Sequence, residues 1–104
     1  MIRKAFLLTL RPGNHAEYER RHNPIWPELQ QVFRQHGVHQ YSIFLDRRTD
    51  RLFASAEIES EELWEQIAAT EVCRRWWDFM KELMLTNEDN SPVAIPLDEV
   101  FHFH

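Results

Sequence analysis

Residues 18–29 (YERRHNPIWPEL) hold the side chains of this chain that are best suited to chemistry. The histidine in this segment, His22, has an ordinary pKa of ~6.5, so near neutral pH its imidazole can both give and take a proton. Tyr18 lies four residues before His22 and Trp26 four residues after it, so on one helix the three rings share a stripe. We therefore predict acid-base chemistry at His22, with the Tyr18 hydroxyl binding a polar ligand or orienting the imidazole.

Two prolines interrupt the helical spacing of this segment. Pro24 and Pro27 each lack a backbone N–H and crowd the carbonyl about four residues earlier, and a residue before proline avoids the α region. We expect the helix to break at Asn23, with Asn23 as the N-cap of a second helix and Pro24 as its first residue. His22 then lies at a helix end, beside free backbone groups. The alternative is a histidine that packs beside Trp26 and bonds to the broken backbone.

Residues 74–77 (RRWW) are the second unusual group. Adjacent side chains on a helix point about 100° apart, so Trp76 and Trp77 cannot fill one core position. We expect one to pack inward and the other to line a cleft or an interface, where an indole face can stack on the apolar face of a sugar. Core packing alone explains the pair equally well. Tyr41, in the middle of a predicted strand, suits either the core or a pocket wall.

The remaining reactive side chains give weaker signals. His102 and His104 form an H-x-H pattern that on a strand points to one face, but no convincing third metal ligand accompanies them. Cys73 is the only cysteine, which excludes an internal disulfide and a cysteine metal cluster and favours a reducing compartment. Its helical spacing with Trp77 and Met80 indicates a packed thiol rather than a nucleophile.

Composition excludes several classes of protein. A net charge of −5 argues against nucleic acid as a partner, and two glycines leave no glycine-rich phosphate loop. The apolar runs are far shorter than the ~20 residues of a membrane span. The charged first residues are not followed by the long apolar region and small-residue cleavage site of a signal peptide, so no signal peptide is expected. With 104 residues, 43% of them hydrophobic and 28% charged, the chain is expected to be one soluble globular domain over residues 1–104.

Hydrophobic periodicity predicts the element order β-α-β-β-α-β. The expected strands cover residues 3–10, 38–45, 52–58 and 100–103, the first helix runs from 14 to 36 with the break described above, and the second runs from 61 to 84 with a restart at 70. This is the order of the ferredoxin-like fold, an α+β fold with both helices on one face of an antiparallel sheet. The other face needs a cover, and four tryptophans are many for so small a monomer, so we expect a homodimer with its sheets face to face.

Residues 18–29 and 72–77 (VCRRWW), with 1–6, 90–92 and 99–101, make the chain closely similar to the L-rhamnose mutarotases over nearly its whole length. The resemblance implies a cytoplasmic dimeric α+β barrel that interconverts the anomers of L-rhamnose in rhamnose catabolism and needs neither a metal nor an organic cofactor. It implies that His22 is the proton donor. It also implies a sugar site lined by Tyr18, Tyr41, Trp76 and Trp77. Glu88, where the family has proline, and residues 102–104 depart from the family pattern outside this set.

In the resulting hypothesis His22 protonates the ring oxygen of the sugar while the C1–O bond breaks, and the open aldehyde rotates and closes again. The partner base stays open at this point: Glu17, Glu19, Glu57, a tyrosine and water are all candidates. The main alternative is a non-catalytic module of the same fold that binds a small ligand, since a fold alone does not decide function. A cofactor-free oxygenase of this fold is a weaker alternative.

Overall fold

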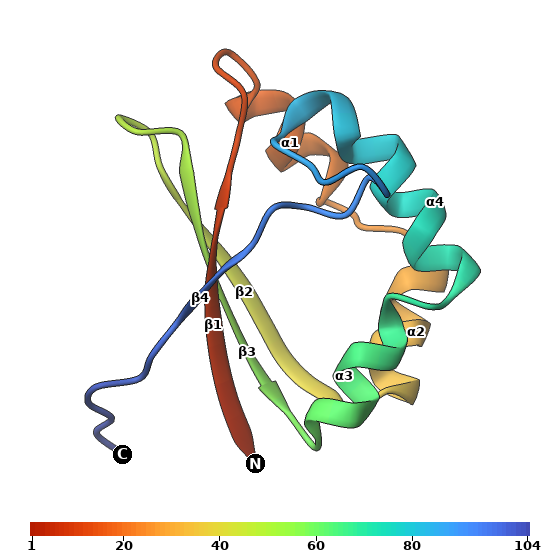
Figure 1. Cartoon of the computed structure of the whole chain (residues 1–104), viewed down its shortest axis with the longest axis vertical. Coiled ribbons are helices and arrows are strands. Elements are labelled where there is room, and N and C mark those ends of the chain that lie inside the picture. Colours follow the sequence, from red (N-terminus) through yellow and green to blue (C-terminus); the bar gives the residue numbers. More distant parts are fainter.

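The computed structural model describes all 104 residues as an antiparallel sheet with helices packed on one of its faces (Figure 1). The strand order is β2-β3-β1-β4. The elements are β1 (Ile2–Thr9), α1 (His15–Arg21), α2 (Pro27–Gln35), β2 (Val38–Asp46), β3 (Arg51–Ile58), α3 (Glu61–Ile67), α4 (Glu71–Met80), the 3-10 helix η1 (Lys81–Leu83) and β4 (Ile95–Leu97). The predicted α+β class, its ferredoxin-like order and the placement of the helices are confirmed, and each predicted helix is divided in two.

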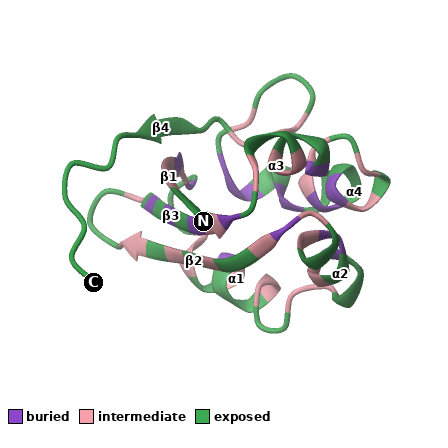
Figure 2. Ribbon diagram, turned by 90° about the horizontal axis from the view of Figure 1, so that it is seen from below, coloured by how far each residue is buried: buried purple, intermediate pink, exposed green.

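Strand β3 shows why the sheet has one buried face. Its alternate residues Leu52, Ala54, Ala56 and Ile58 are at most 4% exposed, because they point at the helices. Phe53, between them, points to the other side and is 43% exposed. Figure 2 shows the buried positions concentrated between the sheet and the helices, so the core lies in that layer and the sites near it are built from inward-facing residues.

Side-chain caps and one glycine set several of the helix ends. Ser60 Oγ accepts a hydrogen bond from the Leu63 amide at 3.0 Å and starts α3, and Thr70 Oγ1 accepts one from the Cys73 amide at 3.2 Å and starts α4. The predicted helix start at 61 and the predicted restart at 70 are confirmed. Gly37 follows α2 with a φ of +75°, and a Cβ there would lie 2.9 Å from Glu59 Cβ, so glycine is required at this position.

The predicted start of α2 is wrong. The helix begins at Pro27, with Trp26 as its N-cap, and not at Pro24 with Asn23 as N-cap. Either proline suits the first helical position, and Asn23 is occupied in closing α1: its amide N–H donates to Arg20 O at 3.2 Å and its side chain donates to Glu19 O at 2.8 Å. The turn between the helices therefore removes Trp26 from the stripe of Tyr18 and His22.

The predicted last strand is also wrong. β4 is Ile95–Leu97, and its register pairs Ala5 with Leu97 and Leu7 with Ile95. Continued along this register, residue 100 would lie opposite Ile2, the first residue of β1, and residues 101–103 would pass the end of that strand. The alternating pattern of 100–103 therefore has almost no strand to pair with, and these residues are exposed. Pro96 fits β4 because proline has no backbone N–H to donate, and an edge strand tolerates this where that side of the strand has no neighbour. The helix predicted up to 84 ends earlier, since Met84 is extended and pairs with Leu10.

The helices leave one face of the sheet uncovered (Figure 1), and a row of apolar residues lies on that face. Leu7, Phe53 and Phe44 are neighbours across the strands, and Ile95 pairs with Leu7 at the edge. Phe44 is 66% exposed and Ile95 is 53% exposed. This row is the part of the sheet that the sequence predicted a second copy to cover.

None of the helices has both the length and the apolar content that a membrane span requires.

Candidate functional site

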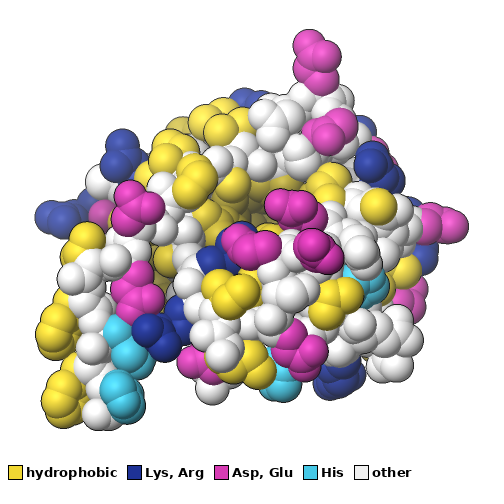
Figure 3. All heavy atoms as spheres, turned by 60° about the horizontal axis from the view of Figure 1, so that its bottom comes forward, with side chains coloured by type: hydrophobic (Ala, Val, Ile, Leu, Met, Phe, Trp, Pro, Cys, Tyr) yellow, Lys and Arg dark blue, Asp and Glu magenta, His cyan; other side chains and the backbone are white.

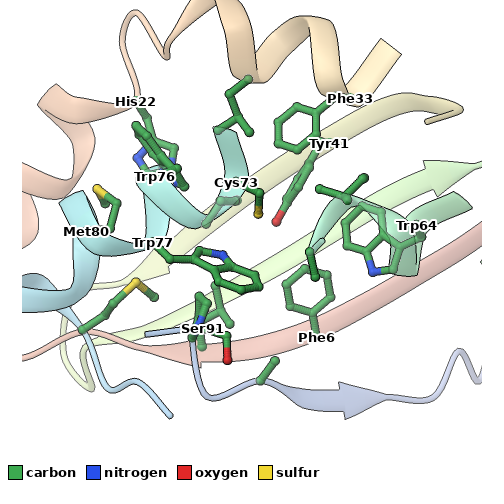
Figure 4. Close-up of a pocket in the computed structure, with 18 of the residues that line it drawn as sticks. Phe6, His22, Phe33, Tyr41, Trp64, Cys73, Trp76, Trp77, Met80 and Ser91 are labelled. Atoms are coloured by element: carbon green, nitrogen blue, oxygen red, sulfur yellow. The ribbon is translucent and has the colours of Figure 1, made fainter. Parts of the chain in front are cut away.

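A cavity of about 340 Å³ lies between the inner face of the sheet and the helices (Figure 4). Its walls are mostly apolar, and the space-filling view shows hydrophobic side chains gathered in a hollow on the face between these layers (Figure 3). The volume is within the range of small-molecule sites. A second hollow of about 600 Å³ shares His22, Tyr18 and Tyr41 with the cavity and adds His15, Glu19 and Arg47.

The structure brings all five predicted site residues to this cavity, from three elements. Tyr18 and His22 come from α1 and its C-terminal end, Tyr41 comes from β2, and Trp76 and Trp77 come from α4. Helical spacing alone favoured one tryptophan at a cleft, whereas the family resemblance implied both. Both line the cavity, because α4 lies along it and Trp76, although buried in the core, borders the His22 end (Figure 4).

The His22 ring is held from several sides. Its Nδ1 lies 2.9 Å from the Tyr18 carbonyl oxygen, its face packs on the Tyr18 ring with centroids 4.3 Å apart, and the Trp76 ring stands edge-on at 5.2 Å. Burial among these rings lowers the pKa of His22, and the hydrogen bond to the carbonyl opposes this shift. At neutral pH the imidazole is therefore mainly uncharged.

Tyr18 and Tyr41 supply hydroxyl groups to the same space. Burial raises the pKa of both phenols, so they remain protonated at neutral pH and can donate a hydrogen bond. Neither hydroxyl bonds to another group of the chain, and no fully buried side-chain polar atom lacks a partner, so both oxygens are accessible from the hollow spaces. They are free to bind the polar groups of a ligand.

An aromatic wall at the other end of the cavity was missed from the sequence. Phe6, Phe33 and Trp64 surround Tyr41 with ring centroids 5.5 to 6.2 Å from it (Figure 4). Lys4 borders this wall, with its Nζ 5.2 Å from the Trp64 ring and 2.8 Å from Glu61 Oε1. The alternation of β1 places Phe6 and Lys4 on the inner face, which was the signal available in the sequence.

The loop of residues 87–92 adds polar groups to the cavity that local sequence patterns did not predict. Asn87 holds its shape: its amide donates to Ser91 O at 2.8 Å and its side chain donates to Ser91 Oγ at 3.0 Å. Asn90 has a φ of +71°, and Asn90 and Ser91 both line the cavity. The Asn90 side chain bonds to no other group of the chain, so its amide can donate to a ligand and accept from it.

The cavity wall contains no carboxylate. Glu17 is bound by Arg20 and Arg21, which lower its pKa to about 2, and Glu57 lies on the opposite face of the sheet, beside Arg3. Glu19 borders only the second hollow, 3.9 Å from an Arg47 nitrogen. Of the candidates for a partner base, the carboxylates are therefore badly placed.

Two other reactive groups weighed from the sequence supply no nucleophile or metal ligand, although Cys73 lines the cavity. Burial raises the pKa of the Cys73 thiol to about 11, so it is not a thiolate at neutral pH. His102 and His104 stack on each other in the exposed C-terminal segment, 5.5 Å apart, and no group of three or more His, Cys, Asp or Glu side chains is placed to hold a metal ion.

Comparison with known proteins gives one consistent result. A family model described as L-rhamnose mutarotase matches residues 3–103. L-rhamnose mutarotases from Klebsiella pneumoniae and Escherichia coli are 57% and 56% identical over 102 residues, 98% of both chains. A crystal structure of an L-rhamnose mutarotase from Formosa agariphila is 42% identical, covers 100% of both chains and superposes with a TM-score of 0.92. A putative antibiotic biosynthesis monooxygenase from Bordetella bronchiseptica, 13% identical over 95% of this chain with a TM-score of 0.68, shares the fold alone.

Proposed function

Because the chain belongs to the L-rhamnose mutarotase family, we propose that it is an isomerase that interconverts the α and β anomers of L-rhamnopyranose, feeding rhamnose catabolism. One observation of the site carries this proposal: His22 is the only group of the cavity wall with an ordinary pKa near neutrality, and the free hydroxyls of Tyr18 and Tyr41 belong to the same cavity. Mutarotation needs proton transfer at two oxygens of one carbon, and this arrangement provides a proton-transfer group with hydroxyls that orient a sugar.

The shape and lining of the cavity suit a deoxy sugar. Indole faces stack on the C–H groups of a pyranose, and Trp76 and Trp77 offer such faces beside His22. Phenol and amide groups at the edges can bind the hydroxyls, while the aromatic wall around Trp64 offers an apolar place for a methyl group. A small site of this kind gains specificity from its few polar groups, and the apolar remainder favours a sugar that lacks one hydroxyl.

In the proposed reaction His22 delivers a proton to the ring oxygen as the C1–O bond breaks. General acid-base catalysis of this kind typically contributes about 10²- to 10⁴-fold. Tyr18 and Tyr41 bind hydroxyls of the sugar, so that after rotation of the open aldehyde the ring closes on the other face. No metal or organic cofactor is part of this proposal.

The proposal includes a homodimer in the cytoplasm. A second copy placed sheet to sheet would cover the exposed apolar row of Leu7, Phe44, Phe53 and Ile95. Burial of apolar surface stabilises such a contact by ~25 cal/mol per Å². The one cysteine, Cys73, is free and buried, which fits a reducing compartment.

Saturation-transfer NMR on L-rhamnose at anomeric equilibrium tests the function. Selective saturation of one anomeric proton reaches the other anomer only if the two exchange quickly, so the protein should make this transfer appear. The His22→Ala variant should abolish it, and the matched variant His36→Ala should retain it. His36 also ends a helix and bonds through Nδ1 to a carbonyl, that of Val32 at 2.7 Å, but it lies outside the cavity.

The same experiment separates the alternatives. A folded parent protein that produces no transfer but binds rhamnose would be a binding module. Transfer that persists in folded His22→Ala would reject His22 as the proton-transfer group while leaving the mutarotase function in place.

A further inference from the structure

The hydrogen bond of His22 fixes which of its nitrogens carries the proton. Nδ1 lies 2.9 Å from the Tyr18 carbonyl oxygen, and a carbonyl oxygen only accepts, so Nδ1 must donate. The Tyr18 carbonyl is available because α1 ends here: the His22 amide bonds to Glu19 O at 3.1 Å and not to the carbonyl four residues back. The backbone therefore holds the imidazole with its proton on Nδ1.

An uncharged imidazole with its proton on Nδ1 has a free lone pair on Nε2. Burial keeps His22 mainly uncharged at neutral pH, so this is its resting form. Nε2 makes no hydrogen bond within the chain, and His22 borders both hollow spaces. In this form His22 has no proton to give to a sugar, because its one N–H is already bonded to the backbone. It must accept a proton before it can donate one.

We propose that His22 begins the reaction as a base: Nε2 takes the proton of the anomeric hydroxyl, and the same nitrogen then gives that proton to the ring oxygen. This inference rests on the mutarotase function proposed above. It also supplies the partner base that the sequence left open, since no carboxylate lines the cavity. His22 acts in turn as base and as acid, and no second proton-transfer group is required.

The atoms balance with one imidazole. The O1–H bond breaks toward Nε2, and the electron pair left on O1 forms the C1=O1 bond as the C1–O5 bond breaks. O5 keeps the electron pair of the broken C1–O5 bond and takes the proton from the imidazolium, which returns to its uncharged form. O1 and O5 are bonded to the same carbon, so one nitrogen can reach both. After rotation about C1–C2 the steps run in reverse and give the other anomer.

Three other groups of the cavity wall, two phenols and one thiol, keep their protons throughout the neutral range. Burial keeps the phenols of Tyr18 and Tyr41 and the thiol of Cys73 protonated, and Lys4 is bound to Glu61. The second hollow adds three charged or titratable groups, namely Glu19, Arg47 and His15. His15 is the other imidazole of this set, and its Nε2 lies 2.5 Å from Asp50 Oδ1. Variants of Glu19 and His15 therefore serve as controls.

The pH dependence of kcat/KM for anomer exchange tests the order of the steps, because it reports the free enzyme. After subtraction of spontaneous exchange between pH 5 and 9, we expect a plateau at high pH. Because the pKa of His22 lies below its ordinary value, the plateau should extend below pH ~6.5, and kcat/KM should then approach a tenfold fall per pH unit. A rate that rises as the pH falls would mean that the imidazolium is the starting form and would overturn the inference. A bell-shaped profile would overturn it as well, since it requires a second titrating group.

Nitrogen NMR of the ligand-free protein gives a second test that does not depend on turnover. The His22 signals, assigned by comparison with His22→Gln, should show a protonated Nδ1 and a bare Nε2 at pH 7.5. A proton on Nε2 would overturn the inference even if the protein is a mutarotase. Absence of any exchange at all pH values would reject the proposed function, while the NMR spectrum would still decide the tautomer.

Three variants test which side chain is responsible for the pH dependence of kcat/KM. His36→Gln, Glu19→Gln and His15→Gln should each keep the shape of the pH profile and stay within about twofold of the parent in kcat/KM. A flat profile in His15→Gln would assign the titration to His15, and a loss of more than tenfold in Glu19→Gln would assign a second base. Either result would overturn the inference.

Discussion

Replacing Tyr18 by phenylalanine removes one oxygen from the cavity and keeps the ring that packs on His22. The Tyr18 side chain is 8% exposed, and its hydroxyl has no partner within the chain. Its loss therefore leaves no buried donor or acceptor unpaired in the free protein, which is the usual source of a large cost. We expect the free energy of unfolding of Tyr18→Phe to stay within about 0.5 kcal/mol of the parent value.

The effect on catalysis depends on which oxygen the Tyr18 hydroxyl binds. A hydrogen bond to an uncharged sugar hydroxyl contributes ~0.5–1.5 kcal/mol, which corresponds to a loss of about 2- to 13-fold in kcat/KM. A bond to the oxygen that carries negative charge during ring opening contributes ~1.5–3 kcal/mol, or about 13- to 160-fold. In the first case the loss appears in KM, and in the second it appears in kcat.

Urea unfolding and NMR exchange kinetics measure the two quantities on the same protein. Tyr41→Phe is the matched variant, because Tyr41 also presents a hydroxyl without a partner in the chain. The reasoning fails if folded Tyr18→Phe keeps the full kcat/KM. It also fails if this variant loses more than about 1 kcal/mol of stability, because its hydroxyl would then have a partner within the protein.

Three further predictions follow from other parts of the structure. Asn90→Gly keeps the positive φ and removes the amide, so we expect KM for L-rhamnose to rise about 2- to 13-fold with kcat nearly unchanged; an unchanged KM would remove Asn90 from the site. We expect sedimentation to show a dimer for the parent and a monomer for Phe53→Glu, which places a charge in the apolar row; a dimeric variant would place the interface elsewhere. Ser60→Ala and Thr70→Ala each remove a helix cap, so each should lower the free energy of unfolding in urea by ~1 kcal/mol. A decrease below about 0.3 kcal/mol would show that water replaces the lost hydrogen bond to the backbone amide.

The parts of the fold that the sequence predicted are those set by local rules. Residues 52–58 alternate in hydrophobicity and form β3 as predicted, and the helices that follow begin at Glu61 and Glu71, next to the predicted start at 61 and restart at 70. The errors lie where two local solutions compete. Residues 100–103 have a better strand pattern than Ile95–Leu97, but only the latter reach β1 in register. Pairing partners are a property of the whole sheet and not of the segment itself.

The site could likewise be predicted only where the signal is carried by single residues or by local spacing. A histidine, two tyrosines and a tryptophan pair were visible as unusual residues, and the resemblance to a family gave them roles. The contribution of Asn90 and of Trp64 was not visible, because it depends on where a loop and a helix end relative to the sheet. Helical spacing alone pointed to one tryptophan at a cleft, but a helix that runs along a cavity can present two adjacent side chains to it, and both line the cavity.

The broken helix at residues 22–24 connects the sequence most directly to the proposed chemistry. In a continuous helix the Tyr18 carbonyl would accept the amide of His22, and the imidazole would have no backbone partner there. Pro24 disfavours continuation, the His22 amide bonds instead to Glu19 O, and the Tyr18 carbonyl is left to hold Nδ1. The free lone pair on Nε2 is thus a consequence of where the helix stops. A variant that let α1 continue, such as Pro24→Ala, should release this carbonyl bond, and the bare-Nε2 signal of His22 should weaken even while the ring remains stacked on Tyr18.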